Sequence, residues 1–544
     1  MAPLLAAALA VGGCASTDSA ESGAEAIGAS AIAETDDVAS SVASEPATAT
    51  DNQESHFDPA DLDDAASDVV GITLDGTSAT ADSAEVTVDG ATVTITAGGT
   101  YSLSGTLTDG EVIVDAPDDD DVIVVLDGAD ISNSDGAAIA VMNADSAVIL
   151  LADDSTNQLT DGSAYTFPDA DTDEPNAALY SASDLTIAGD GALVVTGNYN
   201  DGIASKDGLV IVSGTISVVA ADDGIRGKDY VIIDGGTISV DAGGDGIKAD
   251  NDEDVERGYV LVTDGTVDVS AGDDGIHAAT DFTIGGGALT VAAGDDGIKG
   301  DELVTIDGGS ITITEAFEGI ESEVITVNGG DIVITSSDDG LNVASSDDTT
   351  TTDVGGGPGG GPGGGPGGAE VIGENYIYIN GGTISITIAG DLDEQGDGID
   401  ANGHVVMTGG IVAISGPTDT RNSALDYSGG SFVMTGGLLI GTNVDGRNSE
   451  GVGVGSSQAS MYLSSGSTIS GGTVVQIESA DGESLVTFQP ENDFSVIVFS
   501  SPDLVDGESY DVYLGGTVAG DSVTNLYEST STAGDLVGSV AASL

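Results

Sequence analysis

The stretch "DYVIIDGGTISVDAGGDGIKA" (residues 229–249) holds one complete unit of a repeat that runs through the middle of the chain. It starts with a β-branched run, turns at Asp-Gly-Gly, continues with "TISV" and ends with a short Asp-Gly-Ile (D-G-I) run. The glycine of this last run recurs at Gly202, Gly224, Gly246, Gly275, Gly297, Gly319 and Gly340, with spacings of 22, 22, 29, 22, 22 and 21 residues. A fixed period of this length is typical of stacked repeat proteins.

Three short strands and three turns in each unit predict an all-β parallel β-helix, in which every coil stacks on the one before it. Inward-pointing Ile and Val side chains are expected to form the core, and the glycines to supply corners with positive φ. From about Met461 the period is lost, and the remaining strand-like runs predict a terminal β-cap that covers the last coil.

The chain is expected to have four segments. Residues 1–14 resemble a lipoprotein signal, 15–67 an acidic disordered tether, 68–460 the β-helix, and 461–544 the cap; a Gly/Pro-rich loop (353–369) interrupts the β-helix. Cys14, the only cysteine, ends a short apolar run that is too short to span a bilayer. We therefore expect lipidation at Cys14 and an extracellular, cell-surface protein; the alternative is a free thiol in a cleaved secretory peptide.

The net charge of −86 narrows the classes of partner. Nucleic acids and anionic membrane surfaces are excluded, because binding phosphates requires clustered Lys and Arg. Membrane contact is expected through the lipid anchor only, and the protein is expected to be a monomer. Dense carboxylates favour calcium as a cofactor, although acidity can also serve only solubility.

The residue that follows each D-G-I isoleucine or leucine should point to solvent, since the isoleucine points to the core. Stacked coils would place these residues in one file at about 4.8 Å spacing. The file reads Ala204, Arg226, Lys248, His277, Lys299, Glu321, Asn342. Because cations are so rare elsewhere, we predict that carbohydrate is bound by Arg226, Lys228, Lys248, His277 and Lys299.

Acidic residues run beside this file and are candidate calcium ligands. The predicted metal-binding residues are Asp222, Asp223, Asp245, Asp250, Asp252, Asp254, Asp273, Asp274, Asp295 and Asp296, and the loop 169–174 is a further candidate. Two alternatives stay open. Asp before Gly is common turn chemistry, and the basic file can simply neutralise stacked carboxylates.

No catalytic residues are predicted. The three histidines are scattered, no Ser-His-Asp grouping can be assembled, and a single cysteine makes a zinc site implausible.

The motifs resemble a known family. "NAALYSASDLTIAGDGALVVTGNYNDGIASKDGLVI" (176–211), "DDGIRGKDYVIIDGGTI" (222–238) and "GGDGIKADND" (243–252) are similar to a bacterial carbohydrate-binding β-helix domain found in clostridial surface proteins. "SALDYSGG" (423–430) and "SPDLVDGESYDVYLGGT" (501–517) match its C-terminal part, so the resemblance covers roughly residues 70–530. It implies a right-handed parallel β-helix that binds calcium and plant cell-wall polysaccharides, including acidic pectin and cellulose, with a fold similar to certain pectate lyases.

Three functions follow from these features. The first is a cell-surface, calcium-dependent module that binds plant cell-wall or other acidic polysaccharide without catalysis. The second is a pectate-type lyase, which would need an unprotonated lysine as base; the surrounding aspartates disfavour this. The third is a calcium-stabilised structural protein or adhesin without a glycan ligand.

Overall fold

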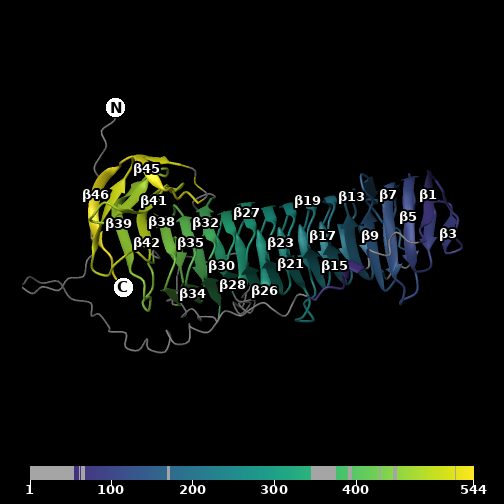
Figure 1. The fold of residues 1–544 in the computed structure, drawn as a ribbon, viewed down its shortest axis with the longest axis horizontal. Helices are drawn as coiled ribbons and strands as arrows, with labels where there is room; N and C mark the ends of the chain where they lie inside the picture. Colours follow the sequence, from purple (N-terminus) through teal and green to yellow (C-terminus); the bar gives the residue numbers. More distant parts are fainter. Residues whose placement is uncertain are drawn as a thin grey trace, which may run out of the picture.

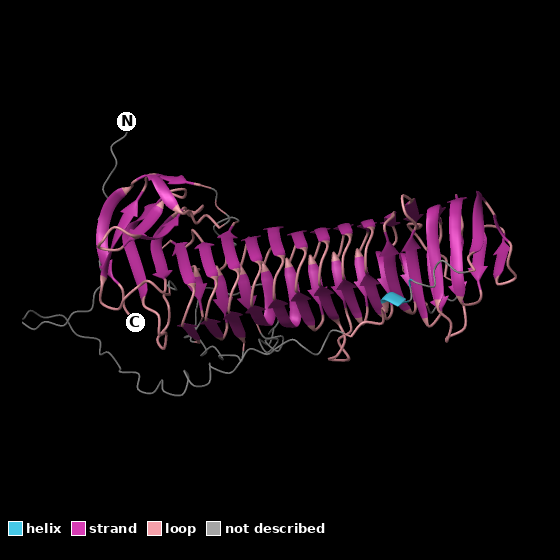
Figure 2. Ribbon diagram, viewed as in Figure 1, coloured by secondary structure: helices cyan, strands magenta, loops and turns pink. Residues whose placement is uncertain are grey.

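The computed structural model describes residues 54–60, 62, 68–167, 172–344, 375–389, 395–427, 430–444, 450–520, 522 and 524–544. It is an elongated stack of short strands, with the first coils at one end and a separate group of C-terminal strands at the other (Figures 1 and 2). Cys14 and the loop 353–369 lie outside the described residues. Among the residues that are described, no helix is long and apolar enough to cross a membrane.

Three parallel ladders of strands form the wall of the helix. Ladder A contains the run after the Gly-Gly turn, ladder B the D-G-I run, and ladder C the run before the Gly-Gly turn. Ladder A consists of β10 (Thr156–Thr160), β13 (Ala192–Gly197), β16 (Thr215–Ala220), β19 (Thr237–Ala242), β22 (Thr266–Ala271), β25 (Ala288–Ala292), β27 (Ser310–Glu315), β29 (Asp331–Ser336), β32 (Thr383–Ile388), β35 (Ile411–Ser415) and β38 (Leu438–Asn443).

Ladder B consists of β4 (Thr92–Ile95), β6 (Glu111–Asp115), β8 (Ile139–Asn143), β11 (Ala177–Ser181), β14 (Asp201–Ser205), β17 (Ile225–Gly227), β20 (Ile247–Ala249), β23 (Ile276–Ala278), the first parts of β26 (Ile298–Ile306) and β28 (Ile320–Val327), β30 (Leu341–Val343), β33 (Ile399–Ala401) and β36 (Leu425–Asp426).

Ladder C consists of β1 (Val70–Gly76), β5 (Gly99–Leu107), β7 (Val122–Ser132), β9 (Ser146–Leu151), β12 (Asp184–Gly189), β15 (Gly208–Ile211), β18 (Tyr230–Ile233), β21 (Tyr259–Val262), β24 (Asp281–Ile284), the second parts of β26 and β28, β31 (Tyr376–Ile379), β34 (His404–Met407) and β37 (Ser431–Met434). The expected parallel β-helix with three strands in each coil is therefore confirmed.

One continuous apolar core fills the helix. Along β20, Ile247 and Ala249 are fully buried while Lys248 between them is partly exposed, which is the alternation expected of a strand with one face inward. The same inward positions repeat from coil to coil and join into a single cluster that extends from Ile72 to Val498. Burial of these aliphatic ladders is the main stabilising contribution, at about 25 cal/mol for each Å² of apolar surface.

The glycines serve two different purposes, of which the sequence predicted one. Gly236, the second glycine of a Gly-Gly turn, has a φ of 95°, as expected for a corner. The D-G-I glycine Gly224 is instead required by close packing, because a Cβ there would lie 2.2 Å from Cγ1 of Val240 and 2.6 Å from the carbonyl oxygen of Gly246.

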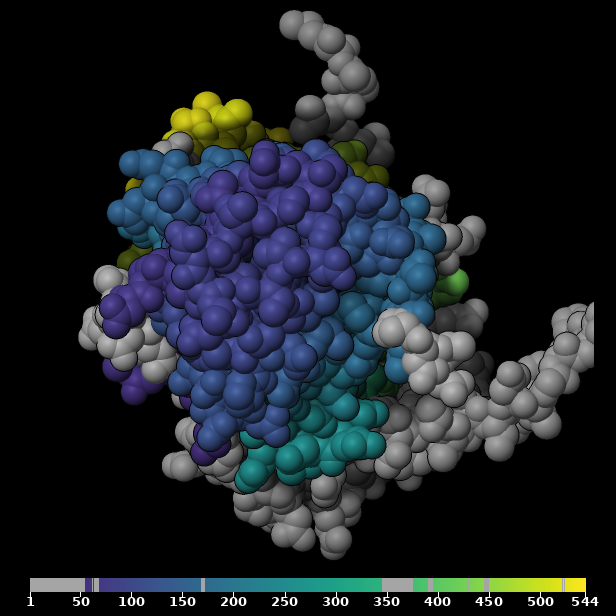
Figure 3. Space-filling model, turned by 90° about the vertical axis from the view of Figure 1, so that its right-hand side faces the viewer, coloured from purple at the N-terminus to yellow at the C-terminus, as the bar shows by residue number. Residues whose placement is uncertain are grey.

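Both ends of the helix are closed. At the N-terminal end, β2 (Ala79–Ala81) pairs antiparallel with β1, and β3 (Val86–Asp89) with β4. Seen end-on, these coils present a filled surface (Figure 3). The C-terminal cap contains β39 (Ser460–Ile469), β40 (Val475–Glu478), β41 (Ser484–Phe488), β42 (Phe494–Ser500), β43 (Ser509–Leu514), β44 (Thr517–Ala519), β45 (Ser529–Thr532) and β46 (Asp535–Ala541).

Strands of the C-terminal region cover the edge of the last coil. Strand β42 pairs antiparallel with both β38 and β39, and a second apolar cluster that includes Phe488 and Phe499 lies beneath it. Asn492 donates from Nδ2 to the backbone oxygen atoms of Ile388, at 2.6 Å, and of Gly416, at 2.9 Å. An open ladder end would expose these groups to edge-to-edge association.

A short part of the segment expected to be a tether contacts the side of the helix. His56 lies 2.8 Å from the hydroxyl of Tyr230 through Nδ1 and 2.9 Å from the hydroxyl of Thr186 through Nε2. The hydroxyl of Tyr259 donates to the backbone oxygen of Glu54, and Phe57 packs on the same apolar patch. The described residues just before the helix are thus attached to coils in its middle.

Replacement of the D-G-I glycine tests the close-packing argument. Gly224→Ala should lower the free energy of unfolding by about 1–3 kcal/mol, because the added methyl group has no space against Val240. Gly285→Ala is the matched control, since no atom lies within 4 Å of a Cβ at Gly285 and its φ is not positive. Urea denaturation of both variants gives the comparison, and equal stability would contradict the packing argument.

Candidate functional site

The side chains that follow the D-G-I isoleucines lie in one file along ladder B. Arg226 pairs in register with Lys248, Lys248 with His277, and His277 with Lys299. We call these four residues the cation file. Ala204 precedes it, and Glu321 and then Asn342 follow it, as the repeat predicts.

The cation file faces outward but is not open to solvent. Its four side chains are between 24 and 27% exposed. They are partly covered because each one lies against carboxylates of its own coil and of neighbouring coils. The sequence predicted an exposed basic groove, but the structure shows a half-buried seam of paired charges.

The aspartates of the D-G-I runs form a second file inside the first. We call it the Asp ladder; it consists of Asp201, Asp223, Asp245, Asp274 and Asp296, and it continues through Glu318, Asp339 and Asp397. In its centre, the backbone N–H of Asp245 donates to Oδ1 of Asp223 at 3.0 Å, and the N–H of Asp274 donates to Oδ1 of Asp245 at the same distance. In these central coils one carboxylate oxygen thus joins a coil to the next, which is a structural use of these residues.

The second carboxylate oxygen of the ladder faces the cation file. Nζ of Lys248 lies 2.6 Å from Oδ2 of Asp245 and 3.5 Å from Oδ2 of Asp223. Lys299 repeats this geometry one coil after His277, with Nζ 2.8 Å from Oδ2 of Asp296.

The residues at the two ends of the cation file also contact acidic side chains outside its central coils. Nζ of Lys299 lies 3.4 Å from Glu321, and Arg226 joins Asp201, at 3.5 Å, to Asp250. Charge neutralisation is therefore a demonstrated role of the cation file.

His277 is held in its charged form. Burial alone would lower its pKa, but contacts with Asp245 and Asp301 outweigh burial and raise the pKa to about 10. Burial would likewise raise the pKa of Asp245, but the contacts from His277 and Lys248 lower it to about 2. The pKa of Lys248 is raised because Asp245 and Asp223 outweigh its burial.

The other predicted residues are spread around this seam. Lys228 is half-buried and makes no ion pair in the described part of the chain. Asp222, Asp273 and Asp295 are exposed, one residue before the ladder. In the loop 250–254, Asp250 binds Arg226 whereas Asp252 and Asp254 point to solvent, and the described residues of that loop do not gather into a metal-binding group.

Three groups of acidic residues have the proximity that a cation site requires. In each, one ligand oxygen from every member lies within 4.8 Å of the others. They are Asp273, Asp274 and Asp295; Asp296, Glu318 and Glu321; and Asp339, Asp397 and Asp400. A fourth group, Asp245, Asp274 and His277, already contains a cationic member.

The group of Asp339, Asp397 and Asp400 was not predicted from the sequence, because the 58 residues that separate Asp397 from Asp339 break the period. The run "GDGID" (396–400) nevertheless carries the D-G-I signature, and Asn342 pairs in register with Asp400. Here the outward file has become acidic, and burial together with the charge of Asp400 raises the pKa of Asp339 to about 9. Burial, with the charges of Asp426 and Asp400, also raises the pKa of Asp397, to about 8.

An unsatisfied oxygen lies at this acidic end. Asn342 is buried, and its Nδ2 donates to Glu318 of the preceding coil at 2.7 Å, whereas its Oδ1 is buried without a partner. The two atoms diverge from one amide carbon, so Oδ1 faces away from Glu318. Amide and carboxylate oxygens are donors that Ca²⁺ prefers, and the types of residue present at this end of the ladder fit such an ion.

The raised pKa of His277 predicts a stability change at alkaline pH. Its folded pKa of about 10 exceeds the usual value of 6.5, so the stabilisation is complete below pH 6.5 and is lost as the pH rises towards 10. His277→Gln should remove that loss, on the order of a few kcal/mol, from the pH profile of the free energy of unfolding.

His404→Gln is the matched control. Burial lowers the pKa of His404, so this residue adds no pH-dependent stability between pH 6.5 and about 10. An alkaline slope that is the same in His277→Gln and in the unmodified chain would contradict the assigned pairing.

Comparisons with known proteins find several that are similar to part of this chain. Residues 89–340 match the model of a family described as "Carbohydrate-binding domain-containing protein". A protein of that description from Acetivibrio thermocellus is 37% identical over 126 residues, which are 23% of this chain and 44% of the relative, so the chain spans less than half of that relative's length.

A solved structure titled as a polysaccharide lyase-like protein from C. thermocellum, a gadolinium derivative, is also similar. It is 37% identical, and the match covers 45% of this chain and 96% of that one with a TM-score of 0.41. The resemblance to a carbohydrate-binding domain family that was expected from the sequence is thus confirmed, and residues 89–340 match the model of that family.

Proposed function

We propose that this chain is a calcium-dependent carbohydrate-binding protein that recognises acidic polysaccharide at the cell surface. The family match supports carbohydrate binding as the general activity. The observation that carries the finer proposal is the group formed by Asp273, Asp274 and Asp295, whose oxygen atoms converge beside the cation file.

This group differs from the other two in its exposure. Asp273 and Asp295 are exposed, and they come from the same turn of successive coils, while Asp274 is a buried member of the Asp ladder. Burial raises the pKa of Asp274 to about 6, so its carboxylate lacks full compensation in the chain itself. A bound calcium ion would supply that positive charge and leave coordination positions for a uronate carboxylate.

The cation file takes an indirect part in this proposal. Lys248 and Lys299 already bind carboxylates of the chain, so little of their charge is left for a polysaccharide. Lys228 makes no ion pair among the described residues and is the basic side chain with the most charge to offer a uronate.

The same contacts disfavour a lyase. A lysine that abstracts the proton beside a uronate carboxylate must be neutral at working pH. In this chain the aspartates around Lys248 and Lys299 raise the pKa of both amines, despite burial. Neither residue is suited to act as a base.

A second calcium ion would have a structural role. Asp339, Asp397 and Asp400 would hold it together with the unsatisfied Oδ1 of Asn342. Such an ion would offset the acidic end of the outward file, as lysine does in the middle coils.

Retention on beads that carry covalently attached polygalacturonate tests the exposed group. The full chain should be retained with Ca²⁺ and released by a chelator, and Asp273→Asn with Asp295→Asn should weaken retention at least tenfold, because two of three carboxylate ligands are lost. Asp222→Asn is the matched control, since Asp222 is exposed in the equivalent turn but belongs to none of the groups.

Three results would overturn the proposal. Retention that ignores the chelator would remove the calcium requirement. Ultraviolet absorbance from unsaturated sugar products would identify a lyase instead. If calcium raises the melting temperature but no polysaccharide is retained, the chain is a calcium-stabilised structural protein.

The surface location rests on Cys14. Lipidation there would send the chain into the detergent phase of a Triton X-114 partition, and Cys14→Ala should move it into the aqueous phase. A chain that stays aqueous in both forms would contradict the anchor.

A further inference from the structure

The outward file changes its chemistry towards the N-terminal end. Before Arg226 it passes through Ala204, Tyr180 and Ala140 to Ile113, each in register with the next. Beside Ile113 and Ala140 lies a cavity of about 540 Å³, which is within the usual range for small-molecule sites.

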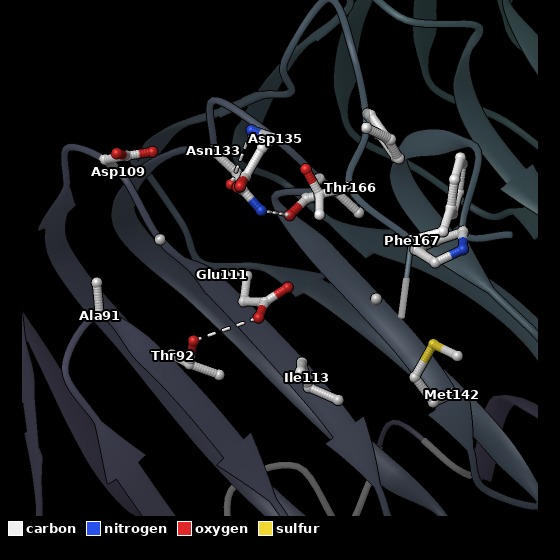
Figure 4. A pocket seen from close by; sticks show the side chains of 16 residues that line it. Ala91, Thr92, Asp109, Glu111, Ile113, Asn133, Asp135, Met142, Thr166 and Phe167 are labelled. Carbon is white, nitrogen blue, oxygen red and sulfur yellow. Dashed lines mark hydrogen bonds between the residues drawn. The ribbon is translucent and has the colours of Figure 1, made fainter. Parts of the chain in front are cut away.

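Two kinds of side chain line this cavity. Tyr165, Phe167 and Met142 supply apolar surface, and Met142 is 42% exposed. Carboxylates come from Asp109, Glu111 and Asp135. Figure 4 shows Glu111 in the middle of the lining, with Asn133, Asp135 and Thr166 on one side and Ile113 and Met142 on the other.

The aromatic wall is fixed by contacts outside the cavity. The Tyr165 hydroxyl donates to Oδ2 of Asp161 at 2.9 Å, and Asp161 is only 4% exposed. Tyr199 stacks on Tyr165 with a centroid distance of 4.4 Å. A wall that is already rigid loses little conformational entropy when a ligand binds.

The polar wall is fixed in a similar way. Asn133 is buried, and its Nδ2 donates to the backbone oxygen of Ala137 at 2.7 Å. The Thr92 hydroxyl donates to Oε1 of Glu111 at 3.2 Å, so the other oxygen of this half-buried carboxylate can accept from a ligand. The lining therefore offers acceptors at defined positions.

We propose that this cavity is a binding site for an uncharged sugar unit, whose hydroxyls donate to Glu111 and Asp135 while its C–H face packs on Phe167 and Met142. The inference rests on the proposed function, because it assigns a site for part of the same polysaccharide. Aromatic side chains combine a large apolar surface with fixed geometry, and methionine adapts to irregular surfaces, so both suit the faces of sugar rings.

The charge of the lining selects against acidic sugars. Its charged members are three carboxylates without a Lys, Arg or His, so a uronate would meet repulsion on entering. A metal ion is not an alternative occupant, because Asp109, Glu111 and Asp135 do not converge into any of the metal-binding groups found among the described residues.

The cavity lies beside the same outward file as the charged seam, a few coils closer to the N-terminus. Ala140 and Arg226 are separated by three steps along ladder B, or roughly 15 Å at the usual strand spacing. A polysaccharide lying along the helix axis would contact the cavity first and the charged seam next. The ligand class is therefore a polymer with both uncharged and acidic units.

The test uses the full chain and intrinsic tyrosine fluorescence, which is undisturbed because the protein has no tryptophan. Neutral gluco-, xylo-, manno- and galacto-oligosaccharides are titrated, together with oligogalacturonate and a glucosamine oligomer. At least one neutral series should bind, and Phe167→Ala and Glu111→Gln should each raise its Kd by about tenfold or more.

Tyr462→Ala is the control, since Tyr462 is an exposed aromatic residue on the cap strand β39. It should leave the Kd unchanged, and all variants should retain the melting temperature of the unmodified chain. Calcium-dependent retention on polygalacturonate beads should persist in Glu111→Gln, which separates this site from the exposed aspartate group.

The outcomes distinguish the two proposals. The inference would be overturned if neutral oligosaccharides bind equally well to both cavity variants. It would also be overturned if no neutral oligosaccharide binds while polygalacturonate is retained. Either result would leave the proposed function standing. Tighter binding of the glucosamine oligomer than of every neutral series would overturn the uncharged class. Failure to bind any polysaccharide would overturn both.

Discussion

In the central coils, the seam depends on the hydrogen bond from the backbone N–H of a D-G-I aspartate to the carboxylate one coil earlier. It fixes the register of ladder B, as between Asp245 and Asp223, but it also stacks carboxylates one strand spacing apart in a buried position. Buried like charges at that distance destabilise the fold unless each is neutralised. In the middle coils Lys248, His277 and Lys299 supply much of this positive charge, whereas the carboxylate of Asp274 is only partly compensated.

The repeat explains why one face can carry three chemistries. Since every coil offers the same outward position, the backbone is indifferent to whether Ile113, Lys248 or Asp400 occupies it. Apolar residues beside the N-terminal cavity, cations in the middle and acids towards the cap are therefore variations on one scaffold. This is how repeat proteins usually build extended binding surfaces.

The features that recur with the repeat period could be predicted from the sequence. The three ladders, the outward direction of Lys248 and the order of the file follow from spacing alone, because stacking converts equal spacing into proximity. Partners that lie off the period could not be found that way. Asp397 lies 58 residues after Asp339 instead of about 22, and the cavity joins Glu111 to Phe167 across coils of irregular length.

The distribution of the cations bears on how an acidic polymer can be held. Lys206, Arg226, Lys248, Arg257, Lys299 and Arg421 each form ion pairs with carboxylates of the chain. Most of the eight Lys and Arg side chains thus stabilise the fold and have little charge left to attract a ligand. In a protein of net charge −86, attraction for a polyanion then has to come from a bound cation or from contacts with uncharged groups. The exposed aspartate group is the site that we propose for the bound cation, and the aromatic cavity is the site that we propose for the uncharged contacts.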